Sequence, residues 1–115
     1  MTFADATLTI GATAMRDSIT HFQPHSAAPG AAGTTSPVGS RVASGTGVVD
    51  GDGDITWGPI NFTGLTANQP VSYVSYWSAS TGGTFRGSAA LSGDAGANAA
   101  GEYTVTSITE TATAS

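Results

Sequence analysis

The chain has 115 residues, a formal net charge of −5 and no cysteine, and only 10% of its residues are charged, against about 25% in an average globular domain. This length corresponds to one small domain, and the lack of cysteine excludes disulfides and cysteine-based zinc sites. The chain has three arginines, no lysine and no apolar run near the roughly 18 residues of a membrane span, so we expect neither nucleic acid nor a membrane as a partner.

The first segment of the chain has the spacing of a helix. Four apolar residues recur at intervals of three and four: Leu8, Ala12, Met15 and Ile19. This pattern predicts a short helix within residues 6–17, weakened by Gly11 and by β-branched threonines.

A strand and a long loop are predicted next. Residues 19–25 predict a strand, and Pro24 places it at a sheet edge or ends it early, because proline has no N–H to donate. Residues 26–40 have no periodic apolar pattern and are punctuated by proline and glycine, so they predict a loop. A loop of this length in a small domain is typical of a functional segment or an interface arm.

The rest of the chain alternates short apolar runs with turn residues. Strands are predicted at residues 41–49, 55–57, 60–62, 71–77, 84–91 and 103–108. Residues 71–77 have no polar face, which predicts a central strand covered on both sides, and residues 93–101 predict a second long loop. We therefore expect an all-β domain over residues 1–115, a β-sandwich of about six or seven short antiparallel strands, with a jelly roll or small barrel as alternatives.

Three alternating carboxylates, those of Asp50, Asp52 and Asp54, have the spacing found in calcium-binding loops. The full calcium loop needs glycine at its sixth position and glutamate at its twelfth, where this chain has Ile55 and Asn61. We interpret the cluster as a hydrated hairpin turn, with a weak calcium site as the alternative, and expect no cofactor.

No pattern in the sequence predicts catalysis. His21 and His25 would lie about 13 Å apart along a strand, too far to share a metal. Serines are frequent, but none lies in a G-x-S-x-G turn, and the other acidic residues are scattered. We therefore expect that the chain is not an enzyme.

Six aromatic residues gather in the middle of the chain: Trp57, Phe62, Tyr73, Tyr76, Trp77 and Phe85. Most of them are expected in the core. Because Tyr76 and Trp77 point to opposite faces of one strand, one of them is expected at a contact between subunits; an aromatic platform for carbohydrate is the alternative. Gly82 and Gly83 predict a hairpin turn that pairs Trp77 with Phe85 across the strands.

Two stretches carry longer patterns. Residues 19–34, ITHFQPHSAAPGAAGT, match a strand ending in a His-x-x-(Asp/Ala)-Pro-Gly loop, and residues 71–91, VSYVSYWSASTGGTFRGSAAL, match a strand followed by a W-S-A-x-(S/T)-G-G-T-F turn. These stretches resemble small tail-fibre-like and minor virion proteins encoded by phages of actinobacteria. Arg41 stands where that group has a tyrosine-arginine strand, whereas Phe22-Gln23-Pro24 replaces an apolar run.

The resemblance implies a non-enzymatic structural protein of a phage particle, located in the virion after assembly in the host cytoplasm. The short chain favours a capsid-surface decoration protein; a minor tail or tail-fibre protein is the alternative, and a carbohydrate-binding module is the second. Expected partners are the major capsid protein or tail proteins. The weakly charged surface also predicts self-association as a trimer or another cyclic ring, with residues 1–18, 26–40 and 93–101 at the contacts.

Overall fold

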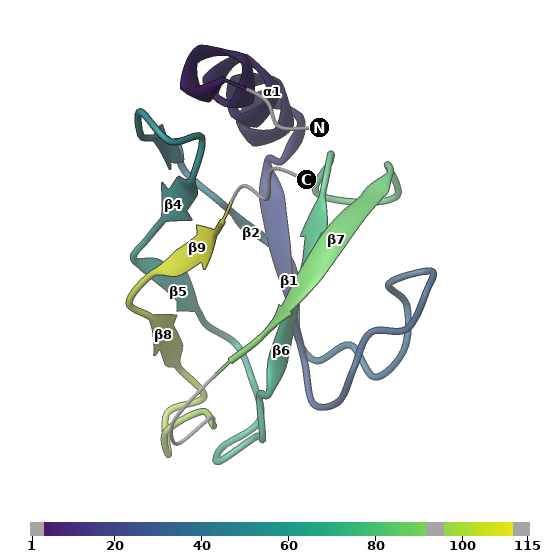
Figure 1. Ribbon diagram of the computed structural model, residues 1–115. Helices are drawn as coiled ribbons and strands as arrows, with labels where there is room; N and C mark the ends of the chain where they lie inside the picture. The colour runs from purple at the N-terminus through teal and green to yellow at the C-terminus, as the bar shows by residue number, and fades with distance from the viewer. Residues whose placement is uncertain (1–3, 92–95, 112–115) are drawn as a thin grey trace.

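The structure, a computed structural model, describes residues 4–91 and 96–111. These residues form one helix, α1 (Asp5–Ser18), and nine short strands. The strands are β1 (His21–His25), β2 (Val42–Ala43), β3 (Val48–Val49), β4 (Ile55–Trp57), β5 (Ile60–Phe62), β6 (Tyr73–Trp77), β7 (Phe85–Ala90), β8 (Tyr103–Val105) and β9 (Ile108–Glu110). They make three antiparallel sheets in two layers, a small β-sandwich-like fold that confirms the predicted class (Figure 1).

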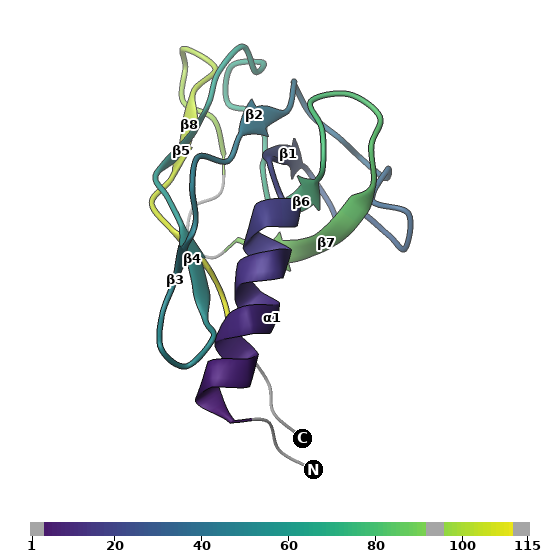
Figure 2. The same cartoon turned by 90° about the horizontal axis from the view of Figure 1, so that it is seen from above.

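Helix α1 forms where the apolar spacing predicted it. Asp5 lies in its first turn and Arg16 in its last. A negative charge at the start of a helix and a positive charge at its end both interact favourably with the helix dipole. The helix ends where Ile19 becomes extended and donates its N–H to the carbonyl of Arg16 at 3.2 Å. Figure 2 shows α1 alongside the β3–β4 hairpin. Ala12 is the buried residue of this helix. Among the described residues, no helix has the length and apolar character needed to span a membrane.

The larger sheet has the strand order β2-β1-β6-β7. β6 lies between β1 and β7, so the prediction of a central, covered strand is confirmed. Phe22 of β1 lies opposite Tyr76 of β6, which puts both side chains on the face that packs into the core.

The prediction for Pro24 is wrong, because β1 has strand neighbours on both sides. The carbonyl of Pro24 accepts the N–H of Val38 at 2.9 Å, so the proline nitrogen faces the following loop rather than β6. The side-chain amide of Gln23 donates to the carbonyl of Val38 at 2.9 Å. A side chain thus supplies a donor on the side where proline has none.

Most of the second layer is one antiparallel pair with an interruption, and β3 (Val48–Val49) adds a short strand beside β4. β4 pairs with β9 and β5 with β8 in a single register, since Ile55 lies opposite Glu110 and Ile60 opposite Val105. The prediction of one strand over residues 103–108 is therefore wrong. The break lets Val105 and Ile108 both face the core, although their separation would put them on opposite faces of an unbroken strand.

The predicted strand over residues 41–49 is also two strands, in different layers. β2 pairs with β1, whereas β3 pairs with β4. Between them Ser44 is buried, with its N–H donating to the carbonyl of Thr20 at 2.8 Å and its hydroxyl to that of Ile19 at 3.3 Å. These bonds hold the chain where it crosses from one layer to the other.

The core lies between the two layers. Its largest members come from both sheets: Phe22, Val74, Tyr76, Trp57, Ile60, Phe62, Val105 and Ile108. The loop at residues 26–40 contains no strand, as predicted, and makes a single bridge between Pro37 and His25. The loop predicted at residues 93–101 lies partly outside the described residues.

Candidate functional site

The central aromatics divide between the two faces of the larger sheet. On the core face Phe22 lies 5.6 Å from Trp57 and 5.2 Å from Tyr76, measured between ring centroids. The hydroxyl of Tyr76 donates to Glu110, and burial, helped by this carboxylate, raises the pKa of Tyr76 far above its ordinary value. Trp57 is 1% exposed, and its unpartnered Nε1 is covered by the backbone of Gly47. These rings stabilise the core.

On the opposite face, Trp77 and Phe85 pair across the β6–β7 hairpin with centroids 5.5 Å apart, as the sequence predicted. The guanidinium of Arg41 lies 3.8 Å from the centroid of Trp77 and donates to the carbonyls of Ala79 and Gly82 at 2.9 and 2.7 Å. Arg41 therefore ties β2 to the hairpin turn by both stacking and hydrogen bonding.

The hairpin turn uses the two expected glycines. Gly82 and Gly83 have φ of 62° and 71°, in the left-handed region that side chains disfavour. The hydroxyl of Ser78 accepts the N–H of Thr84 at 2.8 Å across the turn. Tyr73, at the other end of β6, is half-buried. An exposed aromatic row does not form, because Trp57, Tyr76 and Trp77 are all buried.

A buried hydrogen-bond chain on the same face was not foreseen from the sequence. His25 and Ser75 are both 0% exposed. Nδ1 of His25 lies 2.7 Å from the carbonyl oxygen of Thr35, which can only accept, so Nδ1 carries the proton. Nε2 then accepts the hydroxyl of Ser75 at 2.7 Å, and that hydroxyl accepts the indole N–H of Trp77 at 2.6 Å. Burial lowers the pKa of His25, and its bond to Thr35 opposes this more weakly.

This histidine–serine pair holds a loop in place. The Ser75 hydroxyl is enclosed, so in this conformation no substrate can reach it. Its neighbours fix residues 26–40, since Gln23 donates to the carbonyls of Val38 and Gly39 and Gly33 packs on the ring of Phe85. The only sequence signal is the alternation of Gln23 and His25 on one face of a strand whose other face is apolar.

The acidic turn is held by hydrogen bonds from its own backbone N–H groups to the side chain of Asp50. Oδ1 of Asp50 accepts the N–H groups of Asp52 and Asp54 at 2.9 and 3.0 Å, so one of the three carboxylates is directed into its own turn. Across residues 4–91 and 96–111, no three acidic or histidine side chains come together where they could hold a metal ion.

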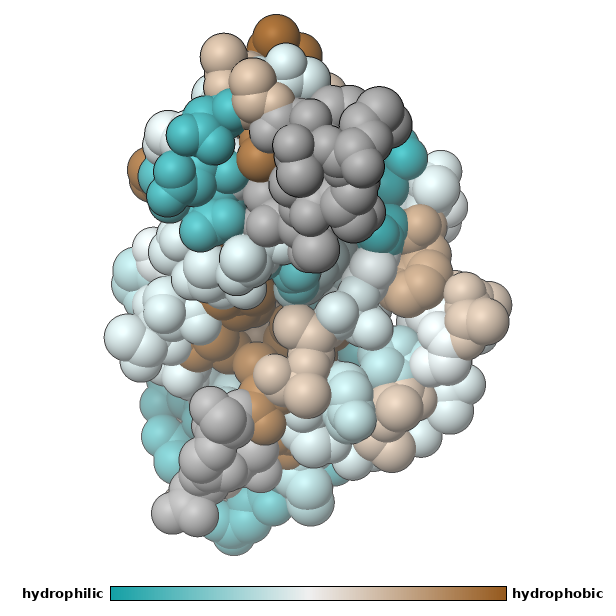
Figure 3. All heavy atoms as spheres, viewed as in Figure 1, coloured by the Kyte–Doolittle hydropathy of each residue, from teal (hydrophilic) through white to brown (hydrophobic). Residues whose placement is uncertain are grey.

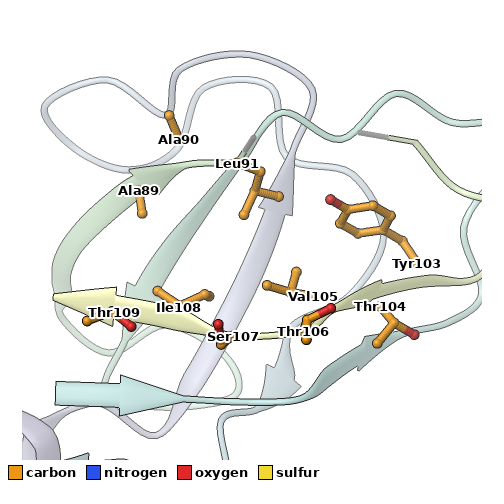
Figure 4. Close-up of a pocket in the computed structure, with 10 residues that line it drawn as sticks. All are labelled: Ala89, Ala90, Leu91, Tyr103, Thr104, Val105, Thr106, Ser107, Ile108 and Thr109. Carbon is orange, nitrogen blue, oxygen red and sulfur yellow. The ribbon is translucent and has the colours of Figure 1, made fainter. Parts of the chain in front are cut away.

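The flank of the sandwich, where β7 and β8–β9 end their sheets, is open. A cavity of about 490 Å³ lies there, lined by residues 89–91 and 103–109 (Figure 4). A second cavity of about 360 Å³ follows along β8, and Tyr103 and Thr104 line both. Figure 3 shows apolar side chains at the floor of a hollow on this side of the molecule, with paler and more polar residues around it.

Comparison of the chain with protein-family models, with curated proteins and with solved structures finds no match. The functional argument therefore depends on the residues and surfaces described above.

Proposed function

We propose that the chain is a structural protein of a bacteriophage particle, and within that class a decoration protein of the capsid surface. The observation that carries the proposal is the exposure of three large apolar side chains at the helix end of the molecule. Ile10 and Met15 of α1 are 71% and 53% exposed, and Val48 of the neighbouring β3 is 66% exposed. Large apolar side chains exposed on adjacent elements are typical of protein contact surfaces.

The helix itself carries little net charge. α1 has Asp5, Arg16 and Asp17, and the last two form an ion pair at 3.1 Å. The acidic turn with Asp50, Asp52 and Asp54 adjoins α1, so it would have to lie outside a contact between two copies. The fixed loop at residues 26–40 adds a surface of constant shape, as an interface arm requires.

The resemblance to phage virion proteins gains support from the positions of the matching stretches in the fold. Residues 19–34 and 71–91 are far apart in the chain, yet they form the adjacent strands β1, β6 and β7 of one sheet. Arg41, the third part of the resemblance, stacks on Trp77 of that sheet. The shared residues therefore form one structural unit, which is typical of a motif retained for its fold.

Copy number tests the proposal and separates it from the tail alternative. Quantitative mass spectrometry of purified particles should find hundreds of copies for a capsid decoration protein. A handful would assign the chain to the tail. Absence from particles would overturn both assignments.

Self-association is tested at the helix end. We expect an oligomer at high micromolar concentration by light scattering, and we expect Ile10→Glu combined with Val48→Glu to reduce it to a monomer. Ala90→Glu, an exposed site on β7, is the control and should leave the oligomer intact. If the wild type is a monomer, the same pair of variants should instead lose binding to particles, and retained binding would reject this contact surface.

A further inference from the structure

One edge of β7 lies at the open flank without a neighbouring strand. Within residues 4–91 and 96–111, β7 pairs with β6 on one side and with no strand on the other. β7 is six residues long, whereas the other outermost strands, β2, β3, β5, β8 and β9, have two or three. An unpaired edge of this length presents backbone N–H and C=O groups with which another strand can pair.

The hydrogen bonds to β6 show which backbone groups of β7 remain free. The N–H of Leu91 donates to the carbonyl of Ser72 at 2.8 Å, in the register of the whole β6–β7 pair. Hydrogen-bonded residues alternate along an antiparallel pair, so Ala89 bonds to β6 as Leu91 does. Ser88 and Ala90 therefore direct their N–H and C=O groups away from β6, toward the open flank.

The cavity of about 490 Å³ beside this edge has an apolar inner wall. Figure 4 shows the side chains of Ala89 and Leu91 directed toward the second layer, and those of Val105 and Ile108 directed back toward β7. All four pack in or against the core. The lining residues, 89–91 and 103–109, include no acidic or basic side chain. The space between the layers at this flank thus suits uncharged, apolar side chains.

We propose that β7 binds an extended, uncharged segment of a partner protein, which pairs antiparallel to it as a fifth strand of the larger sheet. Residues directly opposite each other in an antiparallel pair share a face. Partner residues opposite Ser88 and Ala90 therefore lie on the outer face and exchange backbone hydrogen bonds with β7. The residues between them are apolar and enter the cavity beside Ala89. The proposal does not depend on the phage assignment.

A second copy of β7 fits this edge less well than a partner segment. Two copies paired about a twofold axis would form one continuous sheet with both inner faces on the same side. In the register that pairs Ser88 with its own counterpart, Gly87 of one copy lies opposite Ala89 of the other. Residues this small would leave the cavity of about 490 Å³ largely unfilled. The net charge of −5 also favours a neutral segment over an acidic one.

An NMR titration of the ¹⁵N-labelled full chain tests the proposal. The probes are blocked heptapeptides Thr-X-Thr-X-Thr-X-Thr, in which X is valine, leucine or phenylalanine, each at millimolar concentration. We expect at least one to shift the amides of Ser88 and Ala90 and to protect them from hydrogen exchange. A control peptide of the same composition, with its X residues grouped at one end, should not. The proposal fails if no alternating peptide acts on these amides, or if the shifts lie elsewhere.

Two methylated versions of the responding peptide test the geometry of the edge. Its threonines should donate their N–H groups to β7, whereas the N–H groups of the X residues should face solvent. N-methylation of the threonines should therefore weaken binding at least about tenfold, and N-methylation of the X residues should stay within about threefold. Equal or reversed effects would show that the peptide does not bind as the proposed strand, and would overturn the proposal.

Two substitutions at Ala90 test the same edge from the side of the protein. Ala90→Pro removes an N–H that faces the flank, at an edge position where proline is tolerated, and should weaken binding at least about tenfold. Ala90→Thr keeps this N–H and should stay within about threefold, and equal affinities would overturn the proposal. If Ala90→Pro does not fold, the two methylated peptides decide. Protection of the Ser88 and Ala90 amides in the free chain would mean that the chain itself or a second copy covers the edge, which would also overturn the proposal.

Discussion

On one face of the larger sheet Phe22, Val74 and Tyr76 pack into an apolar core, while on the other face His25 and Ser75 hold a loop through hydrogen bonds. The apolar face depends on area and shape, and its contribution changes little with pH. On the polar face each group depends on its partner, so removal of one atom leaves another buried and unsatisfied. On one side of these strands, stability should therefore depend on the loss of buried apolar area. On the other side, it should depend on the loss of single hydrogen-bond partners.

The largest effect is expected on the apolar face. Phe22→Ala removes a fully buried ring that contacts Trp57 and Tyr76, and should lower the free energy of unfolding by about 3–5 kcal/mol. Phe85→Ala, on the other face and only half-buried, should cost less. Urea unfolding measures both, and equal losses would contradict the assignment of the core to the first face.

Ser75→Ala is the corresponding change on the polar face. It leaves Nε2 of His25 and Nε1 of Trp77 buried without their partner, and should cost about 2–4 kcal/mol. Ser88→Ala, at the exposed cross-strand neighbour of Ser75, is the control. A loss as small as that of the control would show that the hydrogen-bond chain contributes nothing.

The two glycines of the hairpin turn that Arg41 contacts should tolerate a side chain to different extents. At Gly82 a side chain meets only open space, so Gly82→Val should cost the backbone strain alone, about 1–2 kcal/mol. At Gly83 an added Cβ would lie 2.7 Å from the hydroxyl of Ser78, so Gly83→Val should cost more. The reverse order in thermal unfolding would argue against this turn geometry.

The pH dependence should be smaller and specific to His25. Its pKa is lower in the folded state than the unfolded value of about 6.5, so the unfolded chain binds more protons as the pH falls. Stability from this group is complete above about pH 6.5 and declines below it, because protonated Nε2 can no longer accept from Ser75. Tyr73 lies opposite His25 across the strands, His21 is the other ionisable residue of β1, and residues 26–40 contain no ionisable side chain.

Urea unfolding at about pH 7.5 and about pH 5 measures this dependence. His25→Gln should lose part of the decline that the wild type shows, and His21→Gln should keep all of it. An identical decline in His25→Gln would assign the pH dependence to other groups.

The smallest effect is expected at the acidic turn. Asp52→Asn should change stability by no more than about 0.5 kcal/mol, because the turn is held by Asp50 and by the backbone. Added calcium should not raise the melting temperature. A rise of several degrees in the wild type that is lost in Asp52→Asn would establish a calcium site.

Local patterns predicted the helix, the central strand, the hairpin and the aromatic pair, because each depends on neighbours in the chain. They did not predict that residues 41–49 and 103–108 each divide between two sheets. Those breaks depend on contacts between distant segments, such as Ser44 with Thr20. The chain from Thr35 through His25 to Trp77 was missed for the same reason, since three segments supply it.

The pairing of β1 with β6 also affects how the protein folds. β1 ends at His25 and its partner begins at Tyr73, so the larger sheet cannot close until the intervening chain exists. During synthesis, His25 and Gln23 remain in water until β6 has left the ribosome. Closing such a long loop before any contact forms slows folding, which places this domain among slow, β-rich folders with time constants of about milliseconds to seconds. Unpaired strands are then exposed early, and the first 77 residues alone should be prone to aggregate.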